Sequence, residues 1–222
     1  MTKKQKITLV NFILDETGSM ESCREETISG FNEYVSTLKK AETSFQMSLT
    51  KFNSAKTEIV FEAQDIQKVP ELSRDTYVPA DLTPLYDAVG ITVSRINSFI
   101  AQKKTSKKAI PNIICVIMTD GEENASKEYT REQVFDLVKE HEKEGWTFLF
   151  LGANQDAWAS GSQIGLAQGN TLSYNTVDTI NTIRSLGGAT TAYASAMSAD
   201  PAMSNTTNFF DVYYSKKKDK KK

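Results

Sequence analysis

The chain has a single histidine, His141, and two cysteines, Cys23 and Cys115, among its 222 residues. With so few of these residues, a catalytic triad built on histidine, a zinc site and a disulfide framework are all disfavoured. Cys115 lies inside an apolar run at residues 113–117, and Cys23 lies in an amphipathic helical pattern. We therefore expect both thiols to be buried and to act as small hydrophobic side chains.

Long apolar runs are also missing. No stretch comes near the roughly 18 uninterrupted apolar residues that a membrane-spanning helix needs. Residues 1–6 are mostly polar and lead directly into a strand pattern, so we do not expect a simple signal peptide. These features predict a cytoplasmic protein without a transmembrane segment.

Positive charge is scarce over most of the chain. Residues 216–222 hold six lysines and one aspartate, which leaves 20 basic and 27 acidic residues in residues 1–215 and a net charge of −7 there. Because a phosphate backbone binds to a basic face, this acidic body argues against specific nucleic-acid binding. The lysine-rich tail is either a solvated end or a contact for an anionic surface.

The remaining pattern is that of one α/β domain. We expect strands at residues 7–14, 45–52, 57–63, 110–118, 146–151 and 171–174. We expect helices at residues 20–40, 85–101 and 130–143, one that ends near residue 166, and one at 176–203 that is broken in two at Gly187-Gly188. Strands and helices alternate, apart from one hairpin at residues 45–63. This order predicts a Rossmann-like three-layer α/β/α sandwich with a mostly parallel sheet and one antiparallel edge strand.

The chain divides into three parts on this basis. Residues 1–5 are an N-terminal extension, residues 6–203 form the domain, and residues 204–222 are a C-terminal extension that carries the lysine-rich tail. A chain of this length can bury a large core without disulfides.

Three separated fragments place hydroxyls or carboxylates next to apolar stretches. Asp15, Thr17 and Ser19 follow the first predicted strand, and Asp120 follows the strand at residues 110–118. Thr83 opens a helical pattern. Because open α/β sheets bind ligands at the rim where their parallel strands end, we expect all three fragments to meet at that rim.

These five residues supply two carboxylates and three hydroxyls. Mg²⁺ takes oxygen ligands in near-octahedral geometry and keeps waters, so it suits one or two carboxylates with neutral oxygens. The alternate spacing of Asp15, Thr17 and Ser19 allows a curled loop to aim all three inward, and Gly18 permits the backbone to curl. The fragments therefore predict a divalent-metal site for Mg²⁺, with Mn²⁺ and Ca²⁺ as alternatives.

Each fragment also has a purely structural interpretation. Thr17 or Ser19 could cap the next helix, and Thr83 could be the N-cap of the helix after it. Asp120 and the glycine that follows it could form an ordinary turn. The occurrence of all three fragments in one α/β pattern favours the metal site.

Other polar residues of the same rim are open to two interpretations. Glu122 and Glu123 either shape the rim or are solvated turn residues. Residues 154–156 follow another predicted strand and either contact a ligand or cap the next helix.

The sequence resembles the von Willebrand factor A (vWA) family, whose metal-ion-dependent adhesion site is written D-x-S-x-S, then a Thr, then an Asp after the fourth strand. Asp15-x-Thr17-x-Ser19, Thr83 and Asp120 match in order, and the likeness covers about residues 5–200. Thr17 stands where the family usually has Ser, and its hydroxyl offers the same oxygen with an additional methyl group. The segment 152–156 is similar to small stand-alone members from bacteria and phages.

The resemblance implies that Thr17, Ser19 and Thr83 bind the ion directly, whereas Asp15 and Asp120 act through water. Neutral direct ligands leave most of the cation's charge unquenched, so an Asp or Glu of a partner protein can complete the octahedron. The implied function is a noncatalytic, Mg²⁺-dependent protein-binding module that is not an enzyme.

Two other functions are weighed against this one. The first is a metal-dependent phosphoryl hydrolase, because an Asp after a strand is followed two residues later by Thr. That chemistry requires a second carboxylate where Thr17 stands. The second is a structural or assembly component of a phage particle or multiprotein complex, which makes its contacts through the lysine tail or a sheet edge.

Overall fold

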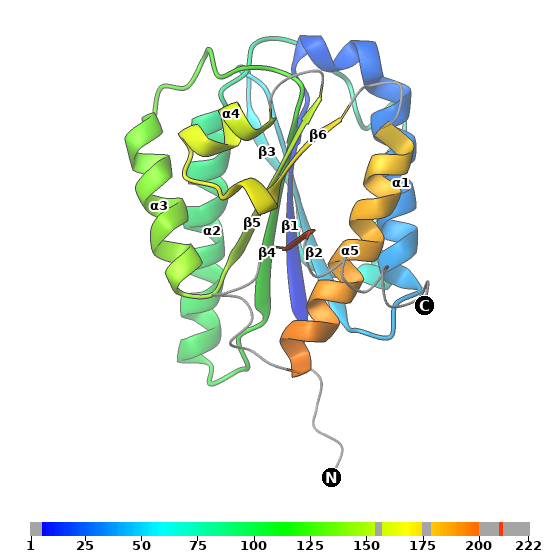
Figure 1. The fold of residues 1–222 in the computed structure, drawn as a ribbon, viewed down its shortest axis with the longest axis vertical. Coiled ribbons are helices and arrows are strands. Elements are labelled where there is room, and N and C mark those ends of the chain that lie inside the picture. Colours follow the sequence, from blue (N-terminus) through cyan, green and yellow to red (C-terminus); the bar gives the residue numbers. More distant parts are fainter. Residues whose placement is uncertain (1–5, 154–156, 175–178, 200–208, 211–222) are drawn as a thin grey trace.

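The computed structural model describes residues 6–153, 157–174, 179–199 and 209–210. Within these ranges, six strands form one sheet between two layers of helices (Figure 1). The strands are β1 (Thr8–Asp15), β2 (Phe45–Phe52), β3 (Thr57–Asp65), β4 (Asn112–Thr119), β5 (Thr147–Ala153) and β6 (Thr171–Tyr174). Their order is β3-β2-β1-β4-β5-β6, and β3 is antiparallel to β2 while the other neighbours pair in parallel. The predicted fold class is confirmed.

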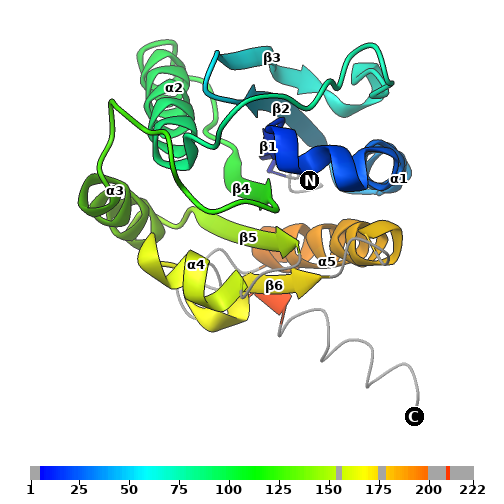
Figure 2. The same ribbon diagram turned by 90° about the horizontal axis from the view of Figure 1, so that it is seen from above.

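The helices cover the two faces of the sheet as Figure 2 shows. On one face lie α1 (Arg24–Lys39) and α5 (Thr179–Ala199), and on the other lie α2 (Leu85–Thr105), α3 (Arg131–Lys143) and α4 (Ala157–Gln163). Three short 3₁₀ helices complete the described elements: η1 (Gly18–Cys23), η2 (Ile66–Lys68) and η3 (Gln168–Asn170). The predicted helix at residues 20–40 thus begins as a 3₁₀ helix and continues as α1.

Strands β1 and β4 lie at the centre of the core. Every residue of both strands is buried. Alternate side chains of β1 pack on opposite layers, with Phe12 toward α1 and α5 and Ile13 toward α2 and α3. Burial on both faces explains why these strands are nearly continuous apolar runs in the sequence. Cys23 and Cys115 are buried free thiols, as expected.

The prediction that the last helix breaks at Gly187-Gly188 is wrong, because α5 is continuous through both residues. A Cβ atom at Gly187 would lie 3.0 Å from the Cβ of Thr37 in α1. A Cβ atom at Gly30 of α1 would lie 2.5 Å from the Cδ1 of Ile183 in α5. The glycines therefore let the two helices approach closely, and this packing offsets the low helix propensity of glycine.

Some predicted features lie at or beyond the limits of the described residues. Residues 1–5, 154–156 and 211–222, including the lysine-rich tail, are outside them. Phe209 and Phe210 belong to the segment predicted as a C-terminal extension, and both are buried. The ring of Phe209 lies 5.0 Å from that of Tyr193 in α5. In the part of the chain that the structure describes, no helix has both the length and the apolar character needed to cross a membrane.

Candidate metal centre

The three predicted fragments meet at the rim where β1 and β4 end. Asp15 is the last residue of β1, Asp120 follows the last residue of β4, and Thr83 stands shortly before the first residue of α2. Ser19 Oγ donates a hydrogen bond of 2.6 Å to Asp120 Oδ1, although the two residues are 101 positions apart in the sequence. The prediction that the fragments converge at one rim is confirmed.

The loop after β1 curls back on its own side chains. Asp15 Oδ1 accepts a hydrogen bond of 2.8 Å from the Thr17 N–H. The hydroxyl oxygens of Thr17 and Ser19 lie 3.2 Å apart. Thr17 is the N-cap residue of η1, yet its side chain makes no capping hydrogen bond. Its hydroxyl faces Ser19, so the capping interpretation does not hold for Thr17.

Thr83 contributes the third hydroxyl beside this loop. The N-cap residue of α2 is Pro84, and no side chain caps the helix there, so Thr83 is not the N-cap. A Cβ atom at Gly121 would lie 3.0 Å from Thr83 Oγ1 and 3.5 Å from Ser19 Oγ. The two hydroxyls therefore border the same small space, and the missing side chain of Gly121 keeps that space open.

The donors suit a hard dication. Oxygens that share an edge of an octahedron around Mg²⁺, at about 2.0–2.1 Å from the ion, lie about 2.9 Å apart. The separation of 3.2 Å between the Thr17 and Ser19 hydroxyls is close to this value. Among the described residues, no three His, Cys, Asp or Glu side chains form a cluster that could hold a metal ion. A metal at this rim would therefore depend on hydroxyl oxygens together with the two carboxylates.

The two carboxyl groups are held in an environment that disfavours their charge. Burial raises the pKa of Asp15 to about 6, although hydrogen bonds from Thr119 and Thr17 partly oppose the shift and the charge of Asp120 adds to it. Burial also raises the pKa of Asp120, against the hydrogen bond from Ser19. A dication bound between them would favour both ionised forms.

Two residues that contact Asp15 were not predicted from the sequence. Thr119 Oγ1 donates to Asp15 Oδ2 at 2.5 Å, and Tyr77 Oη donates to the Asp15 carbonyl oxygen at 2.6 Å. Thr119 directly precedes Asp120, so its place at the end of a strand was an available signal. Tyr77 gave no such signal, because it belongs to a segment without periodicity.

The acidic residues after Asp120 have different roles. Glu122 is exposed, as a solvated turn residue would be. Glu123 is half-buried, and its carboxylate accepts hydrogen bonds from the backbone N–H groups of Ala125, Ser126 and Tyr86 at 2.8, 2.7 and 3.0 Å. Glu123 therefore ties the loop after β4 to the first turn of α2, and its interpretation as a solvated residue is wrong.

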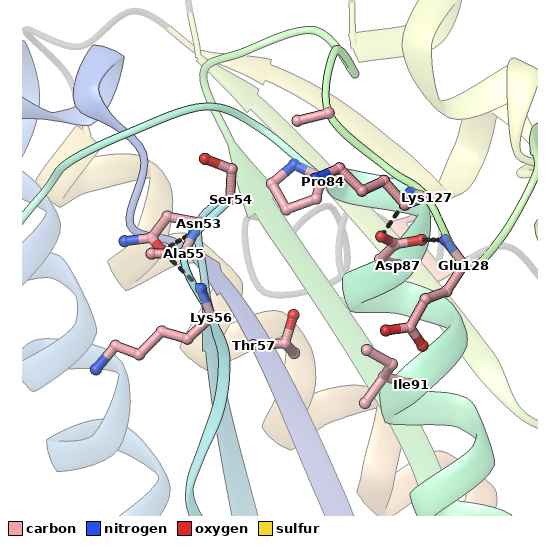
Figure 3. A pocket seen from close by; sticks show the side chains of 11 residues that line it. Asn53, Ser54, Ala55, Lys56, Thr57, Pro84, Asp87, Ile91, Lys127 and Glu128 are labelled. Carbon is pink, nitrogen blue, oxygen red and sulfur yellow. Dashed lines mark hydrogen bonds between the residues drawn. The ribbon is translucent and has the colours of Figure 1, made fainter.

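Two polar hollows flank the first turn of α2. The larger has a volume of about 320 Å³ and lies between the β2–β3 turn, α2 and residues 125–128 (Figure 3). Asp87 lines it, and its carboxylate accepts hydrogen bonds from the backbone N–H groups of Lys127 and Glu128. The smaller hollow, of about 120 Å³, is lined by Gly121 and therefore adjoins the candidate metal centre.

No protein-family model and no curated protein matches this chain. Solved structures do match its fold. The structure of proximal thread matrix protein 1 from the mussel byssus has a TM-score of 0.56 at 12% identity and covers 82% of this chain. Manganese-loaded TRAP protein from Plasmodium vivax has a TM-score of 0.52 at 13% identity and covers 81%. A von Willebrand factor type A structure from Catenulispora acidiphila has a TM-score of 0.53 at 11% identity and covers 85%.

These likenesses show that the chain has a fold of the vWA type. The aligned region is 46% of the mussel chain, 72% of the Plasmodium chain and 43% of the Catenulispora chain. The chain thus corresponds to less than half the length of two of these three proteins.

Proposed function

We propose that this chain is a noncatalytic, Mg²⁺-dependent protein-binding module with a metal-ion-dependent adhesion site of the vWA type. Thr17, Ser19 and Thr83 bind the ion directly, and Asp15 and Asp120 hold it through water. The observation that carries the proposal is the convergence of three hydroxyls and two carboxylates from distant segments on the space beside Gly121.

The proposed partner presents an Asp or Glu to the ion. Asp15, Thr17 and Thr83 are buried, whereas Ser19 is exposed and Asp120 is half-buried. An ion among them would be enclosed by the protein on one side and open to a ligand on the other. Because the direct ligands are neutral hydroxyls, the ion keeps enough positive charge to attract a carboxylate from outside. The Plasmodium structure of similar fold is manganese-loaded, which supports the binding of a divalent ion by this chain.

Isothermal titration of Mg²⁺ into metal-free protein tests the proposal. We expect one binding event in the wild type and none in Asp15→Ala. Asp75→Ala is the matched control, because Asp75 is exposed on the loop that precedes Thr83 and should leave binding unchanged. An absence of binding in the wild type, or equal binding in Asp15→Ala, would reject the proposed metal site.

Partner binding needs a separate experiment. Protein captured from the native host should be recovered in Mg²⁺ and lost in chelator. Capture that persists in chelator would favour an assembly role that does not use the metal. Turnover of a generic phosphoester that Asp15→Asn abolishes would contradict the noncatalytic part of the proposal.

A further inference from the structure

A buried ion pair lies directly beside the candidate metal centre. Lys51 Nζ and Glu16 Oε1 are 2.8 Å apart, and their side chains are 8% and 5% exposed. Glu16 stands between Asp15 and Thr17, and Lys51 is close to the end of β2, the strand that pairs with β1. The pair therefore joins the loop after β1 to the neighbouring strand.

The same two side chains also hold the segment 76–81. Lys51 Nζ donates a second hydrogen bond, of 2.7 Å, to the Thr76 carbonyl oxygen. Glu16 Oε1 accepts a hydrogen bond of 2.8 Å from the Val78 N–H. This segment ends two residues before Thr83, so its position sets where the third hydroxyl of the site can lie.

Backbone contacts continue the attachment toward Thr83. The Ala80 N–H donates to the Glu16 carbonyl oxygen at 3.0 Å, and the Gly18 N–H donates to the Asp81 carbonyl oxygen at 3.0 Å. Asp81 has a φ of +67°, in the left-handed region that a residue with a side chain rarely adopts. Such a conformation persists only where the surroundings hold it in place.

Stability is a poor explanation for this pair. The cost of removing two charges from water largely cancels their attraction, and a well-packed apolar pair is often equally stable. An ion pair with several directed hydrogen bonds does, however, fix the position of the segments that it joins relative to one another. We propose that Glu16 and Lys51 are positioning residues that place segment 76–81, and with it Thr83, against Thr17 and Ser19. This inference rests on the metal site proposed above.

The test is the double variant Glu16→Gln/Lys51→Met, which removes both charges and leaves neither partner ionised and unpaired. Loss of a residue that orients metal ligands typically weakens metal binding by about 10- to 100-fold, and we expect a loss in this range by titration of Mg²⁺. Val138→Ala in α3 is the control, because Val138 is buried far from this loop and its truncation destabilises the core. At a comparable loss of thermal stability, Val138→Ala should bind Mg²⁺ as the wild type does.

Hydrogen exchange of the loop is a second readout that requires no metal. In wild-type protein, we expect the Val78 and Ala80 amides to exchange as slowly as amides at the ends of β1 and β2. In the double variant, we expect segment 76–81 to exchange faster.

Fast exchange of Val78 and Ala80 in the folded wild type would overturn the inference, even if the double variant failed to fold. A folded double variant with unchanged Mg²⁺ affinity would also overturn it. A wild type that binds no Mg²⁺ would reject the proposed function, and the exchange data would still decide whether the pair positions the loop.

Discussion

At the residue scale, Asp15 carries an electrostatic cost in the metal-free protein. Burial raises the pKa of its carboxyl group to about 6 in the folded chain, from the ordinary value of 3.8 that we take for the unfolded chain. The folded state therefore binds more protons than the unfolded state between these two values. The contribution of Asp15 to stability falls as the pH rises from about 4 to about 6, and the loss is complete above that range.

Because the buried charge of Asp15 lowers stability at pH 7, we predict that Asp15→Asn stabilises the metal-free protein at that pH. The same substitution should abolish the response to Mg²⁺. Asparagine can still accept from the Thr17 N–H and can donate to the Thr119 hydroxyl. We expect the free energy of unfolding to rise by about 1–2 kcal/mol at pH 7, below the roughly 3 kcal/mol that a shift of two pKa units would give at most. Urea denaturation at pH 7 and at pH 4 measures it, and the gain should shrink at pH 4. A variant that is less stable at pH 7 would show that the buried charge is compensated.

Gly121 gives a second prediction at this scale. A methyl group there would lie 3.0 Å from Thr83 Oγ1, so Gly121→Ala should either displace Thr83 or fill the space for the ion. We expect at least a tenfold loss of Mg²⁺ affinity, comparable with the loss of a residue that orients a ligand. Gly18→Ala is the matched control. The expectation that the curled loop needs glycine at this position is wrong, because Gly18 has no positive φ, and its Cβ would meet Asp81 O at 3.4 Å, an ordinary contact. Equal Mg²⁺ affinities in the two variants would argue against an ion beside Gly121.

At the element scale, the strands and helices could be predicted from the sequence more completely than the loops. The bounds of β2 and β6 agree with prediction to the residue, because each stands between clear turn signals. The continuity of α5 could not be predicted, because it depends on Thr37 in a helix 150 positions away. A glycine pair read locally indicates a break, and a glycine pair in contact with another helix indicates close packing.

The candidate site divides in the same way. Four of its five proposed ligands could be picked out because they follow predicted strand ends, and Thr83 because it opens a helical pattern. Their convergence at one rim is confirmed, and their binding of a metal stays a prediction. Tyr77 and the pair of Glu16 with Lys51 were not predictable, because they connect segments through a loop with no apolar periodicity. In the alternation of β2, Lys51 falls on the same side as Met47 and Leu49, so its exposure of only 7% fits the strand pattern. The loop carbonyl and the carboxylate that bind its ammonium group could not be predicted from the strand.

The packing of α5 on α1 gives a prediction for this scale. Gly187→Ala should destabilise the protein by about 1–2 kcal/mol through overpacking against Thr37, although alanine favours helices. Gly188→Ala is the control, because Gly188 is partly exposed and the substitution should be neutral or stabilising by up to about 1 kcal/mol. Thermal denaturation of the two variants compares them. Stabilisation by Gly187→Ala would show that the two helices are not in close contact at this point.

At the scale of the whole molecule, metal binding should stabilise the entire fold, because the proposed ligands join β1, β4 and α2. A ligand at 100 times its Kd adds about 2.7 kcal/mol to the free energy of unfolding. For a domain of this size, this corresponds to a rise in Tm of roughly 5–10 °C. Differential scanning calorimetry in Mg²⁺ and in chelator measures the change. Asp15→Ala should show no rise, and an equal rise in that variant would place the ion elsewhere.

The most direct measurement is anomalous diffraction from crystals soaked in Mn²⁺. The account predicts one strong peak about 2.1 Å from the hydroxyl oxygens of Thr17, Ser19 and Thr83, with Asp15 and Asp120 in its outer shell. Ordered, unobstructed loops with no peak among these oxygens would contradict the proposed metal centre and the function that depends on it.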